Sequence, residues 1–548
     1  MKMIRTFCLL VLASGMALAQ ANSPTTSNVA DDLKTLREAI AAQQKQIAEQ
    51  QKQLENLQKQ LETKAAAQPQ VVNAALTTNT PNINTPVTQS DTDKPKESPL
   101  SFRIGGAEFT PGGFVDFENI FRTTNTGNVT ATNFWAIPFG NTAAGHLTEY
   151  RSTGQYSRIN LKTTTKFKGA DVTGYIEADF NGNDAANVFV TSNSHTMRVR
   201  LYWVDLKGAK WEFLGGSSWG LETPNRVGVS PAPADLSLTL GEDAQTHVGI
   251  NYTRAALMRV AYHFSKEFVW AVEAQNPQQF TGQGAEVVFP SVFNAQLAGQ
   301  FDAGATPGAP NGYPDFLTKI AYDHKYAGRG FHFEIGGLTT SAKVAVARTI
   351  ANAGFIKHTS FGAGIMGAVN YELVKNVRVL AQGMWGTGIG RYLIGMGPQV
   401  VAFPVAATPG GICTTGATGA CDVHLSPVRA GDALVGLEAQ AGSKTQFGFY
   451  YGGAYFQRDC QFVDPTTGTL TPIGFGCPLE AGNTVQNRAI QEGTVDWTQT
   501  FWKSPQYGAV LLVTQASYVT RSPWWIAAGI PKNAHLGMGY VSLRYVLP

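Results

Sequence analysis

The sequence predicts an all-β transmembrane barrel of about 16 antiparallel strands, preceded by an N-terminal α-helical coiled coil. From residue 102 onward, apolar and polar residues alternate in runs of roughly the 9–11 residues that a strand needs to cross a bilayer. The connections between these runs are alternately short and long, as in outer-membrane barrels. No later stretch reaches the about 18 consecutive apolar residues of a transmembrane helix, so any membrane insertion has to occur through a barrel.

The composition agrees with strands that are joined by turns and surrounded by lipid. The chain has 548 residues, of which 43% are hydrophobic and only 15% charged, with 58 glycines and 11% aromatic residues. Aromatic residues form girdles at both membrane interfaces of such barrels. The formal net charge of +3 is too small to indicate a nucleic-acid partner.

Residues 1–19 are predicted to be a secretory signal peptide. Lys2 and Arg5 precede an apolar run that begins at Phe7, and the small residues up to Ala19 resemble a cleavage site. The apolar run is too short to span a membrane. Cys8 lies within this run and not after the cleavage site, so lipoprotein attachment is not expected.

Residues 28–64 are predicted to form a coiled coil. Apolar residues recur there with a period of seven, which favours a coiled coil over a single amphipathic helix. Gln43 and Gln50 interrupt the seam, and polar residues at such positions commonly set the register and the number of helices. A solvated helix without partners is the alternative. The residues expected to mediate oligomerisation are Leu33, Leu36, Ile40, Ile47, Leu54, Leu57 and Leu61.

Residues 65–99 are predicted to be a flexible linker, and residues 100–548 the barrel. Ala, Asn, Thr and Pro dominate the linker, and no apolar period continues through it. The predicted crossings are 113–122, 155–168, 171–182, 195–207, 210–219, 256–265, 267–276, 316–325, 330–340, 360–372, 375–387, 432–442, 445–457, 493–503, 506–520 and 534–547. The segment 246–253 also alternates, but an additional strand would break the parity, so we place it in the third long loop.

The stretch from residue 155 to residue 220 predicts a basic lumen wall. In its first strand, Ile159, Leu161 and Phe167 share one face, and basic residues occupy the other. A later strand places Met197, Val199, Leu201 and Trp203 opposite two arginines. The basic side chains predicted to line the pore are Arg158, Lys162, Lys166, Arg198 and Arg200. The strand between them carries Glu177 and Asp179 on the same face, so internal pairing of part of this charge is the alternative.

The third long loop, residues 220–255, is expected to complete a constriction if it folds into the barrel. It carries Arg226, Asp235, Glu242 and Asp243, which would then face the basic wall. An excess of positive charge in a narrow pore raises the local concentration of anions. The wall and the loop together therefore predict weak anion selectivity, with a small carboxylate held by Arg158, Arg198 and Arg200.

The last strand, 534–547, places Val541, Leu543, Tyr545 and Leu547 on one face. It looks like the closing strand that the barrel-assembly machinery reads in many outer-membrane proteins. Those strands usually end in an aromatic residue, whereas this chain ends in Leu547 and Pro548.

Four cysteines outside the signal peptide, Cys413, Cys421, Cys460 and Cys477, predict two disulfides in an exported chain. Proximity alone suggests the pairs Cys413–Cys421 and Cys460–Cys477, and pairing between the two loops remains open. A zinc site is a weaker interpretation, because the cysteines lack a CxxC spacing. The nine histidines are scattered without an HExxH motif, so no metal or cofactor is expected.

One enzyme motif is present but lacks its structural context. The segment from Gly216 to Gly220 matches GxSxG, with Ser218 as the candidate nucleophile. A nucleophile elbow has to open a helix, whereas this segment continues into a loop that contains Pro224. The sequence therefore predicts that the protein is not an enzyme.

The order of the parts resembles the DcaP-like porins of Gram-negative bacteria. Their shared plan is a signal peptide, a Gln-rich heptad helix, a Pro/Thr linker and a barrel of roughly sixteen strands. The segment from Leu214 to Trp219 is similar to a Gly-Gln-Thr-Trp-type stretch of that family, although it lacks the Gln, and 259–277 looks like the family's following hairpin. The resemblance implies a homotrimer in the outer membrane with a periplasmic coiled coil, in contact with lipid and lipopolysaccharide.

The resemblance also implies a function, the passage of small anionic solutes such as dicarboxylates. A structural class competes with it, in which the rod and linker couple the envelope layers and a closed barrel serves only as an anchor. Single-channel conductance separates the two, because a closed anchor carries no current. A gated transporter is a further alternative, but such barrels usually carry a folded plug domain, and residues 65–99 are too few and too polar to form one.

Overall fold

The computed structural model describes residues 98–127, 130–182, 196–233, 247–251, 253–283, 286–291, 293–304, 310–347, 354–406, 420–462, 472–478 and 483–548. The chain divides into two units, Met1–Thr77 and Thr78–Pro548, and all described residues belong to the second. The predicted signal peptide, the coiled coil and all but the last two residues of the linker lie outside the described residues. No helix in the described part of the chain is long and apolar enough to cross a membrane.

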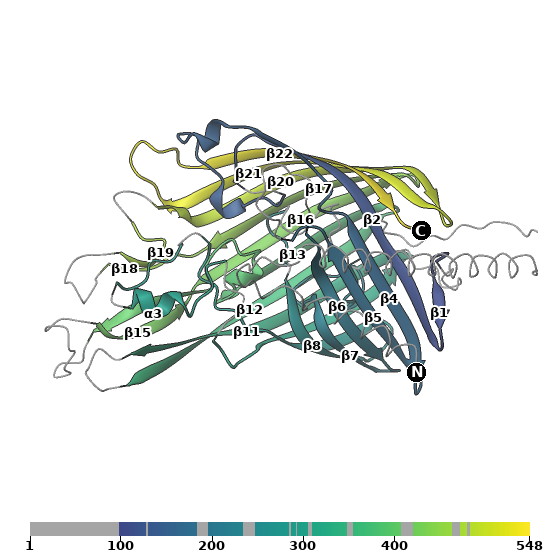
Figure 1. The fold of residues 1–548 in the computed structure, drawn as a ribbon, viewed down its shortest axis with the longest axis horizontal. Helices are drawn as coiled ribbons and strands as arrows, with labels where there is room; N and C mark the ends of the chain where they lie inside the picture. The colour runs from purple at the N-terminus through teal and green to yellow at the C-terminus, as the bar shows by residue number, and fades with distance from the viewer. Residues whose placement is uncertain are drawn as a thin grey trace, which may run out of the picture. The chain divides into compact units, whose positions relative to one another are not determined.

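The second unit forms a closed antiparallel barrel of 16 strands (Figure 1). Each strand pairs with its neighbours in sequence, and β2 pairs with β22, from Phe114↔Val546 to Arg122↔Met538, to close the barrel. The wall strands are β2 (Ala107–Arg122), β4 (Arg158–Phe167), β5 (Ala170–Asp179), β6 (Arg198–Lys207), β7 (Trp211–Trp219), β8 (Arg254–His263), β9 (Phe268–Gln275), β10 (Asp315–Tyr326), β11 (Arg329–Ala347), β12 (Phe355–Val374), β13 (Val377–Thr387), β16 (Arg429–Ala441), β17 (Thr445–Phe456), β20 (Asn483–Ser504), β21 (Gly508–Trp525) and β22 (Ala534–Val546).

The remaining elements extend the wall or fold within the long connections. β1 (Phe102–Ile104) pairs with the start of β2. β3 (Glu149–Thr153) pairs with the end of β2, along the same edge on which β4 pairs with the first part of β2. The long connections hold η1 (Phe134–Ala136), η2 (Ala144–His146), α3 (Asn294–Ala298), η5 (Gly390–Tyr392) and the hairpins β14 (Val400–Ala406)–β15 (Ala420–Pro427) and β18 (Asp459–Gln461)–β19 (Ile473–Phe475). In Figure 1, α3, β15, β18 and β19 lie at one end of the barrel and β1 at the other.

The two ends of the barrel differ in their connections, and we name them the turn end and the loop end. At the turn end, β4 and β5 are joined by Lys168 and Gly169, with φ of 49° and 86°, and β10 and β11 by Ala327 and Gly328, with φ of 52° and 78°. Positive φ at both central residues is the type I′ geometry that matches the twist of a hairpin. In outer-membrane barrels, such short turns face the periplasm.

All predicted crossings are present as barrel strands, although their ends differ. β11, β12, β20 and β21 are longer than predicted, and β20 begins at Asn483 where the prediction begins at residue 493. The added residues extend the hairpins into the long loops. Their side chains do not face lipid there, so apolar and polar residues alternate less regularly. Residues 247–251 and 253 form no strand, so placing the 246–253 segment in the third long loop is correct.

Apolar side chains cover the outside of the barrel. Large apolar residues are exposed at alternate positions along the strands, the reverse of a water-soluble sandwich. They include Ile176 and also Ile159, Phe167, Val541, Leu543 and Tyr545, which were predicted to share an apolar face in the crossings 155–168 and 534–547. The opposite faces carry the buried polar residues, among them Glu177 and Asp179.

The prediction for β6 is wrong beyond Arg200. Glu177 pairs with Leu201 but Ala178 pairs with Val199, so Arg200 is an extra residue in a β-bulge. Because side chains alternate with a period of two, one extra residue moves all later side chains to the opposite face. Leu201 and Trp203, predicted on the face opposite the arginines, are therefore 0% and 7% exposed inside the barrel, whereas Tyr202 between them is 51% exposed.

Candidate functional site in the barrel lumen

The third long loop, between β7 and β8, lies inside the barrel. The backbone N–H of Asn225 donates to Glu334 on β11 (2.8 Å), and that of Val248 donates to Glu492 on β20 (2.7 Å). The side chain of Arg226 bonds to Glu438 on β16. These three strands are not neighbours in the sheet, so the loop crosses the lumen and narrows it.

Arg226 anchors this loop through a buried ion pair with Glu438. Its two terminal nitrogens donate to the two carboxylate oxygens of Glu438, each at 2.8 Å, and both side chains are buried. Tyr450 donates a further hydrogen bond of 3.0 Å to Glu438. The sequence placed Arg226 at the constriction, and the structure places it in the lumen as half of a bidentate ion pair.

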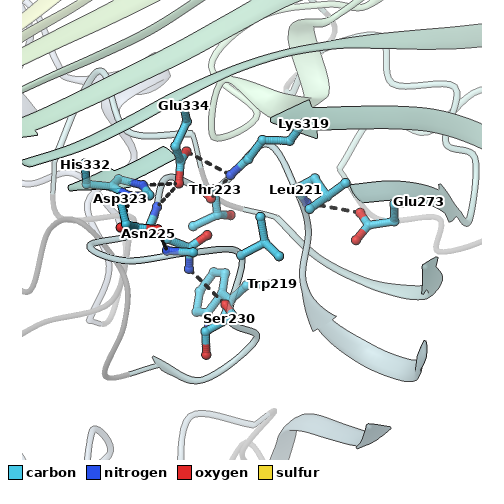
Figure 2. A network of polar contacts seen from close by, with 12 residues as sticks. Trp219, Leu221, Thr223, Asn225, Ser230, Glu273, Lys319, Asp323, His332 and Glu334 are labelled. Atoms are coloured by element: carbon cyan, nitrogen blue, oxygen red, sulfur yellow. Dashed lines mark hydrogen bonds and ion pairs between the residues drawn. The ribbon is translucent and has the colours of Figure 1, made fainter. Parts of the chain in front are cut away.

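A network of polar contacts holds the first part of the loop, as Figure 2 shows. Lys319 donates 2.9 Å hydrogen bonds to the carbonyl oxygen of Thr223 and to Glu334. His332 contacts Asp323 at 2.7 Å through Nδ1 and Glu334 at 2.9 Å through Nε2. Two ring nitrogens that both face carboxylates indicate a doubly protonated imidazole. Wall charges therefore hold the loop backbone as well as one another.

The loop also buries a carboxyl group, that of Glu222, against the wall. Its Oε2 accepts a 2.9 Å hydrogen bond from Gln275, which also donates to Glu273 at 2.7 Å. Burial and the neighbouring charge of Glu273 raise the pKa of Glu222 to about 7. The carboxyl group of Glu222 therefore takes up a proton more readily than that of an exposed glutamate.

The second part of the loop is held by polar contacts and by close approach of the backbone. Asn251 donates to both carboxylate oxygens of Asp432, at 2.8 and 2.9 Å. Gln382 donates to the carbonyl oxygen of Gly249 at 3.1 Å. The carbonyl oxygen of Val248 lies against Gly452 on β17, where a Cβ atom would be only 1.9 Å away.

We expect Gly452→Ala to displace this part of the loop without changing any charge. The added methyl group would meet the backbone oxygen of Val248 at a distance that real Cβ atoms do not show, so the loop has to move. The single-channel conductance in planar bilayers should rise. Gly453→Ala is the matched control, because its Cβ has no neighbour closer than 3.5 Å. Equal conductance of the two variants and the wild type would contradict the role of this contact.

Two of the predicted pore-lining arginines are paired with acidic residues on β5. Arg198 binds both carboxylate oxygens of Asp179, at 3.0 and 2.7 Å. Arg200 donates to Glu177 at 2.9 Å and to Asp179 at 2.7 Å. The alternative left open by the sequence, internal pairing, is what the structure contains. These four charges largely offset one another.

Of the other three predicted lumen cations, Arg158 lies opposite Asp179 in the pairing of β4 with β5, and the two lysines lie nearer the turn end. The guanidinium of Arg158 lies over the ring of Phe114, with 5.4 Å from its carbon to the ring centroid. Lys166 forms an exposed 2.7 Å ion pair with Asp171 beside the tight turn. Lys162 lines a cavity at the turn end. The five residues therefore do not form one continuous basic patch.

Some predicted site residues lie outside the described part of the chain. They are Asp235, Glu242 and Asp243 of the third loop, Cys413, the side chain of Cys421, and the predicted oligomerisation residues Leu33, Leu36, Ile40, Ile47, Leu54, Leu57 and Leu61. Of the two predicted disulfides, the structure contains Cys460–Cys477, with a Cα–Cα distance of 5.3 Å.

Breaking this disulfide should loosen the connection between β18 and β19 and leave the barrel intact. The bond joins residues 17 positions apart, and closing a loop of that size contributes about 3 kcal/mol in the chain-entropy model. We expect faster cleavage of residues 458–482 in Cys477→Ser, measured by limited proteolysis and mass spectrometry. Cys460→Ser breaks the same bond from the less buried side and should behave alike. Wild-type cleavage rates in both variants would show that the bond does not restrain this loop.

The geometry around Ser218 does not provide a nucleophile elbow. Ser218 lies within β7, paired with Ala255 on β8, and the chain continues into a turn and not into a helix. Its hydroxyl makes no hydrogen bond to any group in the described part of the chain. No group of three or more His, Cys, Asp or Glu side chains among the described residues is placed to hold a metal ion.

Comparisons with known proteins find the fold among outer-membrane channels. No family model matches the chain, and no curated protein matches it. The outer membrane channel DcaP of Acinetobacter baumannii has 14% identity and a TM-score of 0.52, covering 81% of this chain and 98% of its own. An anion-selective porin from Comamonas acidovorans has 11% identity and a TM-score of 0.42, covering 80% of this chain and 100% of its own. The likeness to DcaP shows that the described part of the chain has the barrel fold of an outer-membrane channel.

Proposed function

We propose that the chain is an outer-membrane porin of a Gram-negative bacterium that lets small hydrophilic solutes diffuse passively. The observation that carries the proposal is the third long loop, which wall residues hold across the lumen of a closed barrel. A loop in this position narrows the path for solutes and thereby limits their size. The apolar outer face of the strands supports a position in contact with membrane lipid and lipopolysaccharide.

The proposed porin prefers anions, including small carboxylates and dicarboxylates. Support comes from Lys162, Lys444 and Lys503, which line the turn-end opening without ion pairs among the described residues. Rings of lysine or arginine favour anions in other pores. Because Glu177 and Asp179 offset the charge of Arg198 and Arg200, we expect the preference to be weak.

The proposed assembly is a homotrimer with the coiled coil in the periplasm. The heptad period of residues 28–64 supports a coiled-coil oligomer. Because the barrel is closed by its own strands, we expect the barrel to fold without the coiled coil. Deleting residues 28–64 should weaken assembly and leave the barrel folded. Mass measurement in detergent tests this, since a stable monomer of the full chain would contradict it.

The function is tested by reversal potentials in a potassium chloride gradient across planar bilayers. A porin with weak anion preference gives a current and a small reversal potential of the anion-selective sign. Absence of current would instead favour the alternative of an envelope anchor with a closed barrel. A current with cation preference would keep the porin but refute its proposed selectivity.

A further inference from the structure

A cavity of about 290 Å³ opens at the turn end of the barrel. It is lined by the turn-proximal parts of β2, β4, β20 and β21 and by the turn between β16 and β17. Lys162 enters it from β4, Lys444 from that turn and Lys503 from β20. Three lysines from separate parts of the wall therefore share one cavity.

The charge of this cavity is one-sided. No Asp or Glu side chain from the described part of the chain lines it, and none of its three ammonium groups forms an ion pair with a described residue. Even with a negative charge at Pro548, which also lines the cavity, the lining keeps a net positive charge.

Three other lysines of the barrel form ion pairs with carboxylates. At the same end of the barrel, Lys166 is paired with Asp171 at 2.7 Å, and Lys207 with Glu212 at 2.8 Å. Deeper in the lumen, Lys319 is paired with Glu334 at 2.9 Å. Three other lysines of the barrel thus have a carboxylate partner close by, whereas none of the three at the cavity has one among the described residues.

The rest of the lining combines neutral polar side chains with apolar residues such as Leu511 and Val546. Thr110, Asn160, Thr498 and Thr500 present hydroxyl and amide groups, and Tyr175 presents a phenol ring. The volume of the cavity fits a small molecule and not a protein segment. A single exposed lysine contributes little to binding of a single charge, because water screens the pair. Three lysines around one small volume favour an anion that carries several charges.

We propose that the turn-end cavity binds a small multivalent anion, such as a di- or tricarboxylate or a phosphate compound, through Lys162, Lys444 and Lys503. This inference deepens the proposed anion preference, because it assigns the preference to one opening of the pore. An anion held there reduces the current of smaller ions when it is added to the turn side.

The test uses the full chain in detergent with citrate as the probe, measured by titration calorimetry. Citrate should bind the wild type. Lys444→Gln/Lys503→Gln should bind citrate about tenfold more weakly, because the loss of one exposed charge lowers the affinity by up to about fivefold. The matched control is Lys266→Gln/Lys375→Gln, which removes two exposed lysines from other tight turns at the same end. It should keep wild-type binding. Equal weakening in both double variants, or no binding by the wild type, would overturn the proposal.

Bilayer recordings separate this inference from the proposed function. Citrate on the turn side should interrupt the chloride current of the wild type, acetate should not, and citrate on the opposite side should act more weakly. Citrate binding in calorimetry without any bilayer current would keep the site and reject the porin. A chloride current that citrate does not affect, with no heat of binding, would keep the porin and reject the site.

Discussion

Glu438→Ala is expected to release the third long loop and to increase the single-channel conductance. Glu438 is 2% exposed and accepts hydrogen bonds from Arg226 and Tyr450, with Arg378 also close enough to interact with its charge. Its removal leaves two buried guanidinium groups without this carboxylate. Breaking a buried ion pair from one side costs about 3–5 kcal/mol, which weakens loop docking by about 100-fold or more.

The opposite substitution provides the control for this prediction. In Arg226→Ala, Glu438 keeps Tyr450 and the nearby charge of Arg378, so the conductance should rise less than in Glu438→Ala. Arg226→Ala/Glu438→Ala removes both partners of the pair and should fall between the wild type and Glu438→Ala. Hydrogen exchange of residues 220–233 reports the loop directly. Wild-type conductance and exchange in Glu438→Ala would show that this ion pair does not hold the loop.

The sequence predicts the barrel well because every membrane strand obeys the same local rule. Lipid requires an apolar side chain at every second position of a membrane strand. Each strand, for example β4, β5 or β22, meets this requirement independently of the others. The strand ends are less certain where hairpins extend beyond the lipid, as in β20. The face of Leu201 was predicted wrongly because one unbroken alternation was assumed, although the apolar positions change from Met197 and Val199 before the bulge to Val204 and Leu206 after it.

The inside of the barrel could not be predicted in the same way, because its contacts are distant in sequence. Glu438 is recognisable as an inward charge between Leu437 and Ala439, but its partner Arg226 is 212 residues away. Gly452 carries no sequence signal for the backbone that rests on it. The alternation could have indicated Lys503, which precedes a tight turn, whereas the meeting of three lysines at one cavity depends on barrel closure.

Arg200→Glu is expected to destabilise the barrel more than it changes ion selectivity. The Arg200 side chain is 1% exposed and bonds to both Glu177 and Asp179. A glutamate there places a third buried carboxylate beside these two and removes the cation that offsets them. The lost pair alone costs about 3–5 kcal/mol, and repulsion between the carboxylates adds to this cost. The midpoint of thermal unfolding in detergent should fall clearly.

Two further variants separate the loss of pairing from the change in net charge. Glu177→Gln/Arg200→Gln removes one charge of each sign, so it should unfold closer to the wild type than Arg200→Glu does. Arg198→Gln removes a half-exposed cation and leaves Asp179 its bond from Arg200, so its effect should be small.

Arg198→Glu/Arg200→Glu, the direct test of whether these arginines attract anions, gathers four carboxylates in one cluster. Impaired folding of this variant would follow from the pairing that the structure contains. If it instead unfolded at the wild-type temperature and shifted the reversal potential toward cations, the arginines would act as unpaired pore charges. The selectivity of the channel would then reside at β5 and β6 and not at the lysines of the turn end.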